Sequence, residues 1–257
     1  STTSVGLGEL ILAAVGNGAQ RVVIGLGGTG TNDAGAGCLY ALGTTATSDD
    51  GADATALLGA GGGALSRLST VDLSAAVEAL RGVYLVIASD VDNPLLGLRG
   101  ATNGYARQKG ADEAAVMELE GALEQFVAAV GRRADGKEPA VALGAGAGGG
   151  LGYALMCLGA TRVPGIATVL ETVGLGELIA QAYVVVTGEG SFDWQSLRGK
   201  VVSGVAAAAL EQGRPCVVIA GQVQVGRREY AASGVTAAFC VIHHLADRGM
   251  DKRQGFD

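Results

Sequence analysis

The segment VVVTGEGSFDWQSLRGK, residues 184–200, predicts a strand, a glycine turn and the start of a helix. Its three consecutive valines favour a buried strand, because β-branched side chains pack well on a pleated sheet. Glu189, Asp193, Gln195 and Lys200 follow the valines. In α/β folds, ligands bind in the crevice beyond the carboxyl ends of the strands. The segment therefore predicts both an α/β unit and a candidate site.

The same alternation of strand and helix runs through the whole chain. The expected strands are residues 21–26, 83–89, 140–143, 183–187, 216–220 and 237–242. The expected helices are residues 8–15, 34–42, 74–80, 113–130, 151–158 and 201–211. Several strands are continuous apolar runs, which is typical of sheets covered by helices on both faces. We therefore predict an α/β fold, in which residues 43–69 form a long loop or a hairpin.

The composition is that of a globular protein that handles small molecules. Of the 257 residues, 49% are hydrophobic and 17% are charged, which excludes a disordered chain. The net charge of -7 argues against a nucleic-acid partner, because such proteins present a basic face. The four cysteines form no C-x-x-C pair, so we expect buried, reduced thiols.

Residues 140–161 carry no charge and are long enough to span a bilayer on length alone. Their many glycines disfavour a lipid-exposed helix, so we expect a short strand, a glycine loop and a helix instead. The N-terminus lacks the basic region of a signal peptide. We expect a cytoplasmic protein without a membrane partner.

The first candidate site is the glycine loop IGLGGTGTNDAGAG, residues 24–37. Gly25, Gly27 and Gly30 satisfy the dinucleotide pattern G-x-G-x-x-G, but the aspartates about 20 residues further on lie outside any expected strand. No Gly-Lys-Ser/Thr follows, so the loop is not a Walker loop. What remains is a helix start whose backbone N–H groups could hold a phosphate or a carboxylate. The alternative is a tight turn with Asp33 as a helix cap.

The second candidate site is SDVDNPLLGLRGATNGYARQKGA, residues 89–111. Asp90, Asp92 and Asn93 offer adjacent oxygens that suit Mg²⁺, which takes one or two carboxylates and keeps several waters. The alternative is a turn ahead of Pro94. Lys109 could bind an anion or be solvated.

In the third site, the opening segment, Lys200 would lie near a helix start. A cation there is unfavourable against the helix dipole unless an anion binds nearby. We expect Trp194 to pack and not to react. His243 and His244 are adjacent and would point to opposite faces of a strand, so neither is expected to be a ligand or a catalyst.

Taken together, four blocks of the sequence resemble the bacterial glycerate kinases of the glycerate 2-kinase type. The blocks are GLGGTGTNDAGAG, ASDVDNPLLGLRGAT with QKGA, GAGAGGGLGYAL and TGEGSFDWQSLRGKVVSGVA. The resemblance implies an enzyme that transfers the γ-phosphoryl group of ATP, with Mg²⁺, to a hydroxyl of D-glycerate; 2-phosphoglycerate is the favoured product. It also implies two α/β domains, which we place at residues 1–175 and 176–257.

The resemblance gives the candidate residues roles in phosphoryl transfer. It implies Asp193 as the base, with Asp33 as a rival carboxylate, and Lys200 as a further catalytic group. It implies Asp90 and Asp92 as metal ligands. Substrate or nucleotide binding is expected at Gly27, Gly28, Thr29, Asn32, Asn93, Lys109, Glu189 and Gln195.

The chain also departs from the family pattern. The Pro-Asp-Ser-Phe-Lys-Gly motif near the family's N-terminus is absent, and Ser191 stands where the family often has arginine. The residues after 242 differ from the family's closing helices, so we expect one domain to be incomplete in this chain. Two alternatives stay open: a nicotinamide-dependent oxidoreductase that uses the Gly25–Gly30 loop, and a non-catalytic remnant. Homo-oligomerisation is left open as well.

Overall fold

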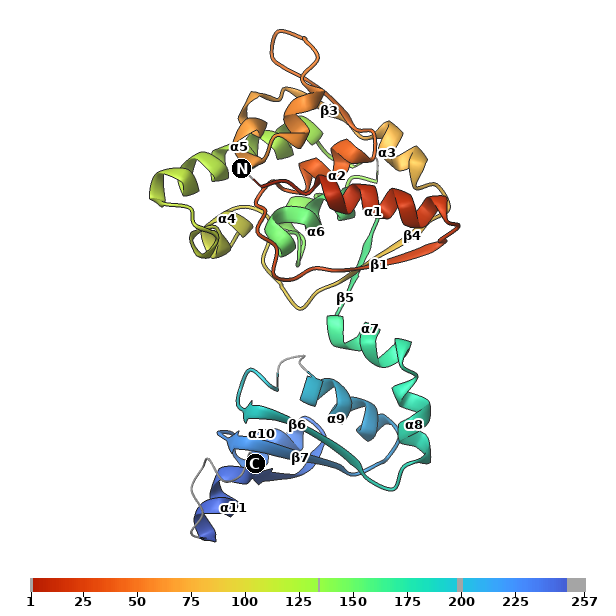
Figure 1. Ribbon diagram of the computed structural model, residues 1–257, viewed down its shortest axis with the longest axis vertical. Coiled ribbons are helices and arrows are strands. Elements are labelled where there is room, and N and C mark those ends of the chain that lie inside the picture. Colours follow the sequence, from red (N-terminus) through yellow and green to blue (C-terminus); the bar gives the residue numbers. More distant parts are fainter. Residues whose placement is uncertain (1, 134, 198–200, 249–257) are drawn as a thin grey trace. The chain divides into compact units, whose positions relative to one another are not determined.

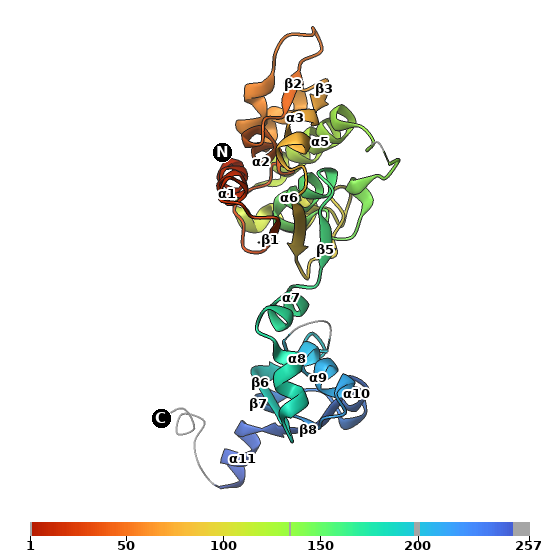
Figure 2. The ribbon, with the colours of Figure 1, turned by 90° about the vertical axis from the view of Figure 1, so that its right-hand side faces the viewer.

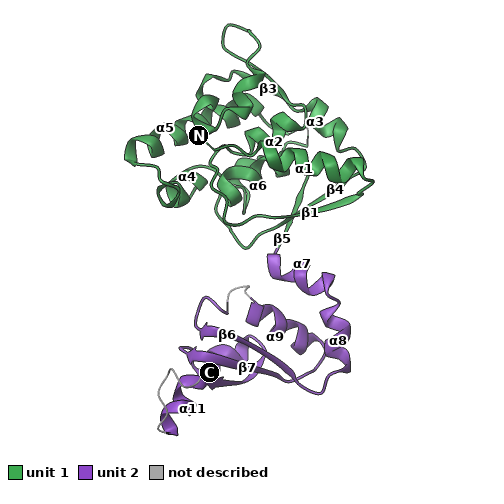
Figure 3. Cartoon of the chain, in the orientation of Figure 1, with its two compact units in different colours: residues 1–163 green, residues 164–257 purple. Residues whose placement is uncertain are grey.

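The computed structural model describes residues 2–133, 135–197 and 201–248. The chain divides into two compact units, residues 1–163 and 164–257 (Figure 3). The boundary that we placed after residue 175 falls within a helix of the second unit, α8 (Leu175–Gln181). Strands alternate with helices in both units and the main sheets are parallel, so the predicted α/β class is confirmed.

The first unit is built around one parallel sheet (Figure 1). Its strands are β1 (Arg21–Gly25), β2 (Thr45–Thr47), β3 (Thr70–Asp72), β4 (Tyr84–Ala88) and β5 (Thr161–Val163). Its helices are α1 (Val5–Gly16), α2 (Ala36–Ala41), α3 (Ser74–Ala79), α4 (Ala101–Tyr105), α5 (Glu113–Val130) and α6 (Ala147–Cys157). Short 3₁₀ turns are η1 (Thr55–Gly59), η2 (Gly62–Arg67), η3 (Arg107–Lys109) and η4 (Pro139–Val141).

The sheet has the order β1-β4-β5, and all of its pairs are parallel. The excursion expected over residues 43–69 contributes β2, which pairs with β3 as a separate antiparallel ribbon. This ribbon lies at the opposite end of the unit from β5 (Figure 1, Figure 2). The strand that follows the glycine loop along the chain is therefore not a neighbour of β1 in the main sheet.

Alternate side chains of the sheet build the core of the first unit. Ile24 from β1 and Ile87 from β4 pack against Ile11 of α1 and Leu155 of α6, and all of these side chains are buried. A second cluster gathers around Phe126 of α5, whose ring meets the Tyr153 ring edge-on at 6.1 Å. The first cluster holds the carboxyl ends of β1 and β4, and the second includes Ala34 and Leu95 from the candidate loops that follow these strands.

The strand predicted at residues 140–143 is not formed. The turn η4 occupies this position, and the unpredicted β5 supplies the third strand instead. Gly148, Gly149 and Gly150 follow with φ values of 63°, 69° and 94°. A Cβ atom on Gly149 would lie 1.9 Å from the Thr31 carbonyl oxygen, so only glycine lets the two loops approach this closely. The apolar run at residues 140–143 therefore does not indicate a buried strand: Val141 and Leu143 are exposed, and the close packing is made by the glycines that follow.

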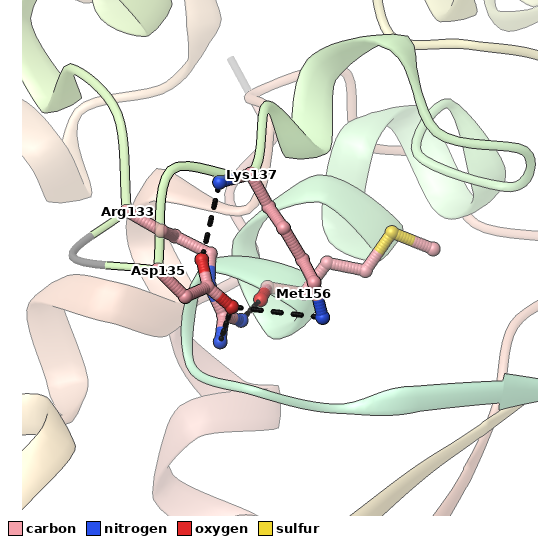
Figure 4. A network of polar contacts seen from close by, with 4 residues as sticks. All are labelled: Arg133, Asp135, Lys137 and Met156. Atoms are coloured by element: carbon pink, nitrogen blue, oxygen red, sulfur yellow. Dashed lines mark hydrogen bonds and ion pairs between the residues drawn. The ribbon is translucent and has the colours of Figure 1, made fainter.

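The polar segment before η4 is fastened to the end of α6. Figure 4 shows Arg133, Asp135 and Lys137 beside Met156. The Arg133 guanidinium donates to the Met156 carbonyl oxygen and pairs with the Asp135 carboxylate at 3.1 Å. A cation at a helix C-terminus is favourable, because the last carbonyl groups carry partial negative charge.

In the part of the chain that the structure describes, no helix is both long and apolar enough to cross a bilayer.

The second unit has a parallel sheet of order β6-β7-β8. Its strands are β6 (Val185–Phe192), β7 (Cys216–Val223) and β8 (Val235–Cys240). Its helices are α7 (Gly165–Thr172), α8, α9 (Val201–Glu211), α10 (Arg227–Ala232) and α11 (Val241–Asp247). One sheet face packs against α9, whereas the alternation leaves Val186, Ile219 and Phe239 about half exposed on the other face.

Two sequence predictions for this unit are wrong. The strand β6 runs on to Phe192, so Glu189 and its flanking glycines lie within the strand and not in a turn. A Cβ atom on Gly188 would lie 2.2 Å from the Ile219 carbonyl oxygen, which shows that glycine lets β6 and β7 approach. His243 and His244 belong to α11, not to a strand, because β8 ends at Cys240.

Candidate active site

Two adjoining hollows in the first unit lie beside the first glycine loop. The smaller has a volume of about 120 Å³, and we name it the glycine hollow after its lining by Gly27, Gly28, Thr29, Gly148 and Gly149. The larger has a volume of about 310 Å³, and we name it the alanine hollow after its lining by Ala106, Ala111 and Ala115, with Asn32 and Glu118. Lys109, at the end of η3, lines both hollows.

Lys109 is the cation of this site. Its Nζ donates a hydrogen bond of 2.6 Å to the Thr31 carbonyl oxygen, which fixes the ammonium group beside the first glycine loop. Burial lowers the pKa of Lys109, and the nearby Asp33 carboxylate partly opposes that shift. An ammonium group has three N–H donors, so the one described hydrogen bond leaves capacity for an anionic ligand.

Asp33 does not reach either hollow, because its side chain is 0% exposed. One carboxylate oxygen, Oδ2, accepts hydrogen bonds of 2.8 Å from both the backbone N–H and the hydroxyl of Ser4. The other oxygen, Oδ1, accepts a hydrogen bond of 3.1 Å from the Gly35 N–H. Ser4 precedes α1, so this aspartate joins the start of α1 to the glycine loop. The arrangement is that of an anchor and leaves no room for a substrate at the carboxylate.

Asn32 lies in the wall of the alanine hollow and is 9% exposed. Its Nδ2 donates to the Thr102 hydroxyl oxygen at 3.1 Å, which connects the loop to α4. Within the described residues, its Oδ1 is buried without a hydrogen-bond partner. Thr29 is half-buried in the lining of the glycine hollow.

The loop after β4 carries the two proposed metal ligands, Asp90 and Asp92, and the neighbouring Asn93. Asp90 and Asp92 are both exposed, and an Asp92 carboxylate oxygen pairs with Arg162 at 2.5 Å. Asn93 holds the loop together, because its Nδ2 donates to the Arg99 carbonyl oxygen at 2.7 Å and its Oδ1 accepts from the Tyr105 hydroxyl at 2.8 Å. Over the described ranges, no group of three or more His, Cys, Asp or Glu residues could hold a metal ion.

In the second unit, Asp193 shapes a turn after β6. Its Oδ1 accepts from the backbone N–H groups of Gln195 at 2.8 Å and Ser196 at 3.2 Å. Gln195 is exposed, and Trp194, which we expected to pack, is 56% exposed. Glu189 is half-buried, and its Oε1 has no partner among the described residues. Lys200 lies outside the described residues.

The sequence did not indicate the far wall of the alanine hollow. That wall comes from Gly62 and Gly63 in η2 and from Ala115 and Leu119 in α5. A Cβ atom on Gly62 would lie 2.1 Å from the Asn32 carbonyl oxygen, so this glycine is required for close approach to the first loop. The run of three glycines at residues 61–63 was the signal that could have drawn attention to it.

Comparisons with known proteins agree with the resemblance of the four sequence blocks. A sequence model of the glycerate kinase family matches residues 1–251. The glycerate 2-kinase of Escherichia coli is 40% identical over 257 residues, which are 100% of this chain and 66% of that protein. The glycerate kinase of Halalkalibacterium halodurans is 38% identical over 255 residues, or 99% of this chain and 66% of that protein.

A solved structure supports the fold as well. The crystal structure from Salmonella typhimurium LT2, provisionally named glycerate kinase 2, has a TM-score of 0.75 and 35% sequence identity. The match covers 94% of this chain and 61% of that chain. The present chain thus spans just under two thirds of the length of the proteins it matches. Because the family model covers nearly all of it, this chain belongs to the glycerate kinase family.

Proposed function

We propose that the chain carries the glycerate kinase activity of its relatives: transfer of a phosphoryl group from ATP to a hydroxyl of D-glycerate. The observation that supports this most directly is the half-buried Lys109 between the glycine hollow and the alanine hollow. Phosphoryl transfer requires little covalent chemistry from the protein; it requires positioning and charge neutralisation. A lysine beside glycine-rich backbone supplies both.

The chemistry follows from the proposed substrates. The glycerate hydroxyl oxygen bonds to the γ-phosphorus, the bond from that phosphorus to the ADP oxygen breaks, and the hydroxyl proton leaves to a base. We propose Asp193 for that base, because the rival Asp33 is enclosed and both of its carboxylate oxygens already accept hydrogen bonds from the protein. We propose 2-phosphoglycerate as the product, with Lys200 and Glu189 as further contacts to substrate.

Mg²⁺ would neutralise charge on the nucleotide phosphates in this reaction. Asp90 and Asp92 offer the oxygen ligands that Mg²⁺ prefers. Asp92, however, already pairs with Arg162, so a metal at Asp92 would have to displace that cation. We therefore propose that Mg²⁺ enters with ATP. We also propose a cytoplasmic location for the protein.

The oxidoreductase alternative finds no support in the sheet. In a dinucleotide-binding fold, the acidic residue that binds the ribose lies about 20 residues after the glycine loop, at the end of the next strand. Here the next strand, β2, pairs with β3 outside the main sheet, and the aspartates after it hold their own turn: Asp50 accepts from the Ser48 hydroxyl at 2.7 Å. The glycine loop can therefore still bind an anion, but among the described residues it lacks the acidic residue that would bind the ribose of a dinucleotide.

The test measures the release of ADP from ATP–Mg²⁺ in the presence of D-glycerate with a coupled assay. We expect turnover that depends on D-glycerate and that falls by at least about 10²-fold in Lys109→Met, because a positioned charge at the transferred group is lost. Arg107→Met is the matched control, since Arg107 lies on the same short helix but pairs with Glu113 at the surface. Glycerate-independent ADP release, or equal loss in both variants, would contradict the proposal.

A further inference from the structure

The two hollows that share Lys109 differ in size and in lining. Small-molecule sites have volumes of roughly 300–1,000 Å³. The alanine hollow, at about 310 Å³, lies at the lower end of that range, whereas the glycine hollow, at about 120 Å³, is too small for more than one chemical group. Neither volume suits a whole nucleotide.

Resting on the proposed function, we propose that the alanine hollow is the hydroxy-acid subsite, that the glycine hollow receives the transferred phosphoryl group, and that Lys109 contacts both ligands. Lys109 lines both hollows and its ammonium group is fixed at the Thr31 carbonyl oxygen, so one cation can neutralise the carboxylate of the acid and the phosphoryl oxygens. Placing acceptor and donor on the two sides of one fixed charge brings the reacting groups together.

The backbone around the glycine hollow suits a phosphoryl group. Gly28 has a φ of 64°, and Gly148 and Gly149 have φ values of 63° and 69°. Left-handed residues beside ordinary ones turn successive N–H groups toward one side, which forms an anion-binding concavity. A Cβ atom on Gly28 would meet nothing within 4 Å, so packing does not explain glycine at this position. The left-handed backbone itself is what requires glycine there.

The lining of the alanine hollow suits a small acid with hydroxyl groups. Three alanines and Leu119 form apolar surface, while Lys109 and Glu118 supply one charge of each sign. Lys109 can take the carboxylate of a three-carbon acid, and Glu118 can accept hydrogen bonds from its hydroxyl groups. The hollow would leave little room for a larger sugar acid or for a nucleobase beside the acid.

Two neighbouring alanines on α5 allow a matched test of the hydroxy-acid subsite. Ala115 lines the alanine hollow, whereas Ala114 is exposed and does not. Leucine is a good helix former, so both Ala115→Leu and Ala114→Leu should fold. By titration calorimetry with D-glycerate, we expect Ala115→Leu to raise Kd by about tenfold or more. Ala114→Leu should match the unmodified protein, and inorganic phosphate should bind all three proteins equally.

Gly27→Val is the corresponding test of the glycine hollow. Gly27 lines this hollow, has no left-handed φ, and a Cβ atom there would meet nothing within 4 Å, so the backbone tolerates a side chain. We expect Gly27→Val to weaken the binding of inorganic phosphate by about tenfold without changing Kd for D-glycerate. Gly25→Val is the control, because Gly25 lies in β1 and outside the lining. Lys109→Gln should weaken both ligands.

The proposal would be overturned if the unmodified protein bound no D-glycerate, or if Ala115→Leu bound it normally. Equal loss of both ligands in Ala115→Leu, or loss of only one in Lys109→Gln, would overturn it as well. Binding is measured without turnover, so its outcome is separate from that of the proposed function. Normal subsite binding with no glycerate-dependent ADP release would refute the activity alone. If Ala115→Leu had the same glycerate-dependent turnover as the unmodified protein, the assignment of the two subsites would be refuted and the proposed activity would stand.

Discussion

Replacing Asp33 by asparagine tests whether this residue is an anchor. The Asp33 carboxylate accepts two hydrogen bonds at Oδ2, both from Ser4, and one at Oδ1, from Gly35. Asparagine has a single acceptor oxygen, so its amide N–H₂ group must face at least one of these donors. In the less unfavourable orientation, one hydrogen bond is lost and two are weakened by the loss of charge. At about 1.5–3 kcal/mol for a hydrogen bond to a charged group, we expect a loss of about 2–3 kcal/mol of unfolding free energy.

Thermal unfolding of the first unit measures this loss. For a unit of this size, about 1 kcal/mol corresponds to about 2–4 °C, so Tm of the first unit should fall by roughly 4–12 °C. The single tryptophan, Trp194, lies in the second unit. Its fluorescence therefore follows the second unit and should change little, whereas calorimetry records both units and should show the shift in the transition that the fluorescence does not follow.

A double-mutant cycle with Ser4→Ala isolates the contact between the two residues. Ser4→Ala removes one donor to Asp33 and the acceptor of the Cys38 N–H, which lies 3.0 Å from the Ser4 hydroxyl. Because the two residues share a hydrogen bond, their effects should be non-additive by about 0.5–3 kcal/mol. Asp33→Asn with an unchanged Tm, or strictly additive effects of the two variants, would refute the anchor.

Four further outcomes follow from single contacts. In urea unfolding, Arg133→Ala should lower the unfolding free energy by about 1–2 kcal/mol, because the end of α6 loses a cation and a hydrogen bond. Lys137→Ala is its control and should lower the unfolding free energy by less than about 1 kcal/mol, because the ion pair between Lys137 and Asp135 is exposed. Burial raises the pKa of Cys38 to about 12, so a thiol reagent at pH 8 should label Cys38 only after denaturation. Asp193→Asn should leave stability nearly unchanged, because asparagine caps a turn as well as aspartate, while the proposed base role predicts a fall in turnover of about 10²–10⁴-fold. Phosphate binding should weaken as pH rises through the lowered pKa of Lys109, below its usual 10.5, and Lys109→Gln should show no such alkaline limb in calorimetry.

Local patterns predicted the regular elements where local chemistry decides them. The helix predicted at residues 113–130 is α5, and its N-cap is Asp112, whose side chain accepts from the Ala115 N–H at 2.8 Å. A periodic apolar face with an aspartate cap is contained in a few turns of sequence. The strands β1, β4, β7 and β8 were predicted because each is a short, continuous apolar run, which is also a local pattern.

The errors occur where a distant segment decides the conformation. Residues 140–143 look like a strand, yet they begin within the turn η4, and the Ala140 carbonyl oxygen accepts from the N–H of the distant Leu95. The three-residue strand β5 carries a threonine and an arginine, and only its pairing with β4 makes it a strand. Such contacts span many residues of sequence, so no local pattern contains them.

The candidate site shows the same limit. Asp92 was assigned to a metal from its neighbours in sequence, but its partner Arg162 is 70 residues away. Asp33 was considered as a base because it follows a glycine loop, yet its partner Ser4 precedes α1. A motif identifies which residue types are close to a loop. It does not tell which of them face a hollow and which face the interior.

Four consecutive residues of the first glycine loop are each held by a different part of the first unit. Lys109 holds the Thr31 carbonyl oxygen, Thr102 holds the Asn32 amide, Ser4 holds the Asp33 carboxylate, and the Ala34 N–H donates to the Gly149 carbonyl oxygen at 3.0 Å. Fixing a binding wall by independent contacts keeps ligand groups at constant positions, which is what phosphoryl transfer needs from a protein. The buried Asp33 then contributes to function without touching a ligand: it holds the backbone to which Lys109 is bound. Loss of that anchor should therefore weaken phosphate and D-glycerate binding together, whereas a change in one hollow should affect one ligand.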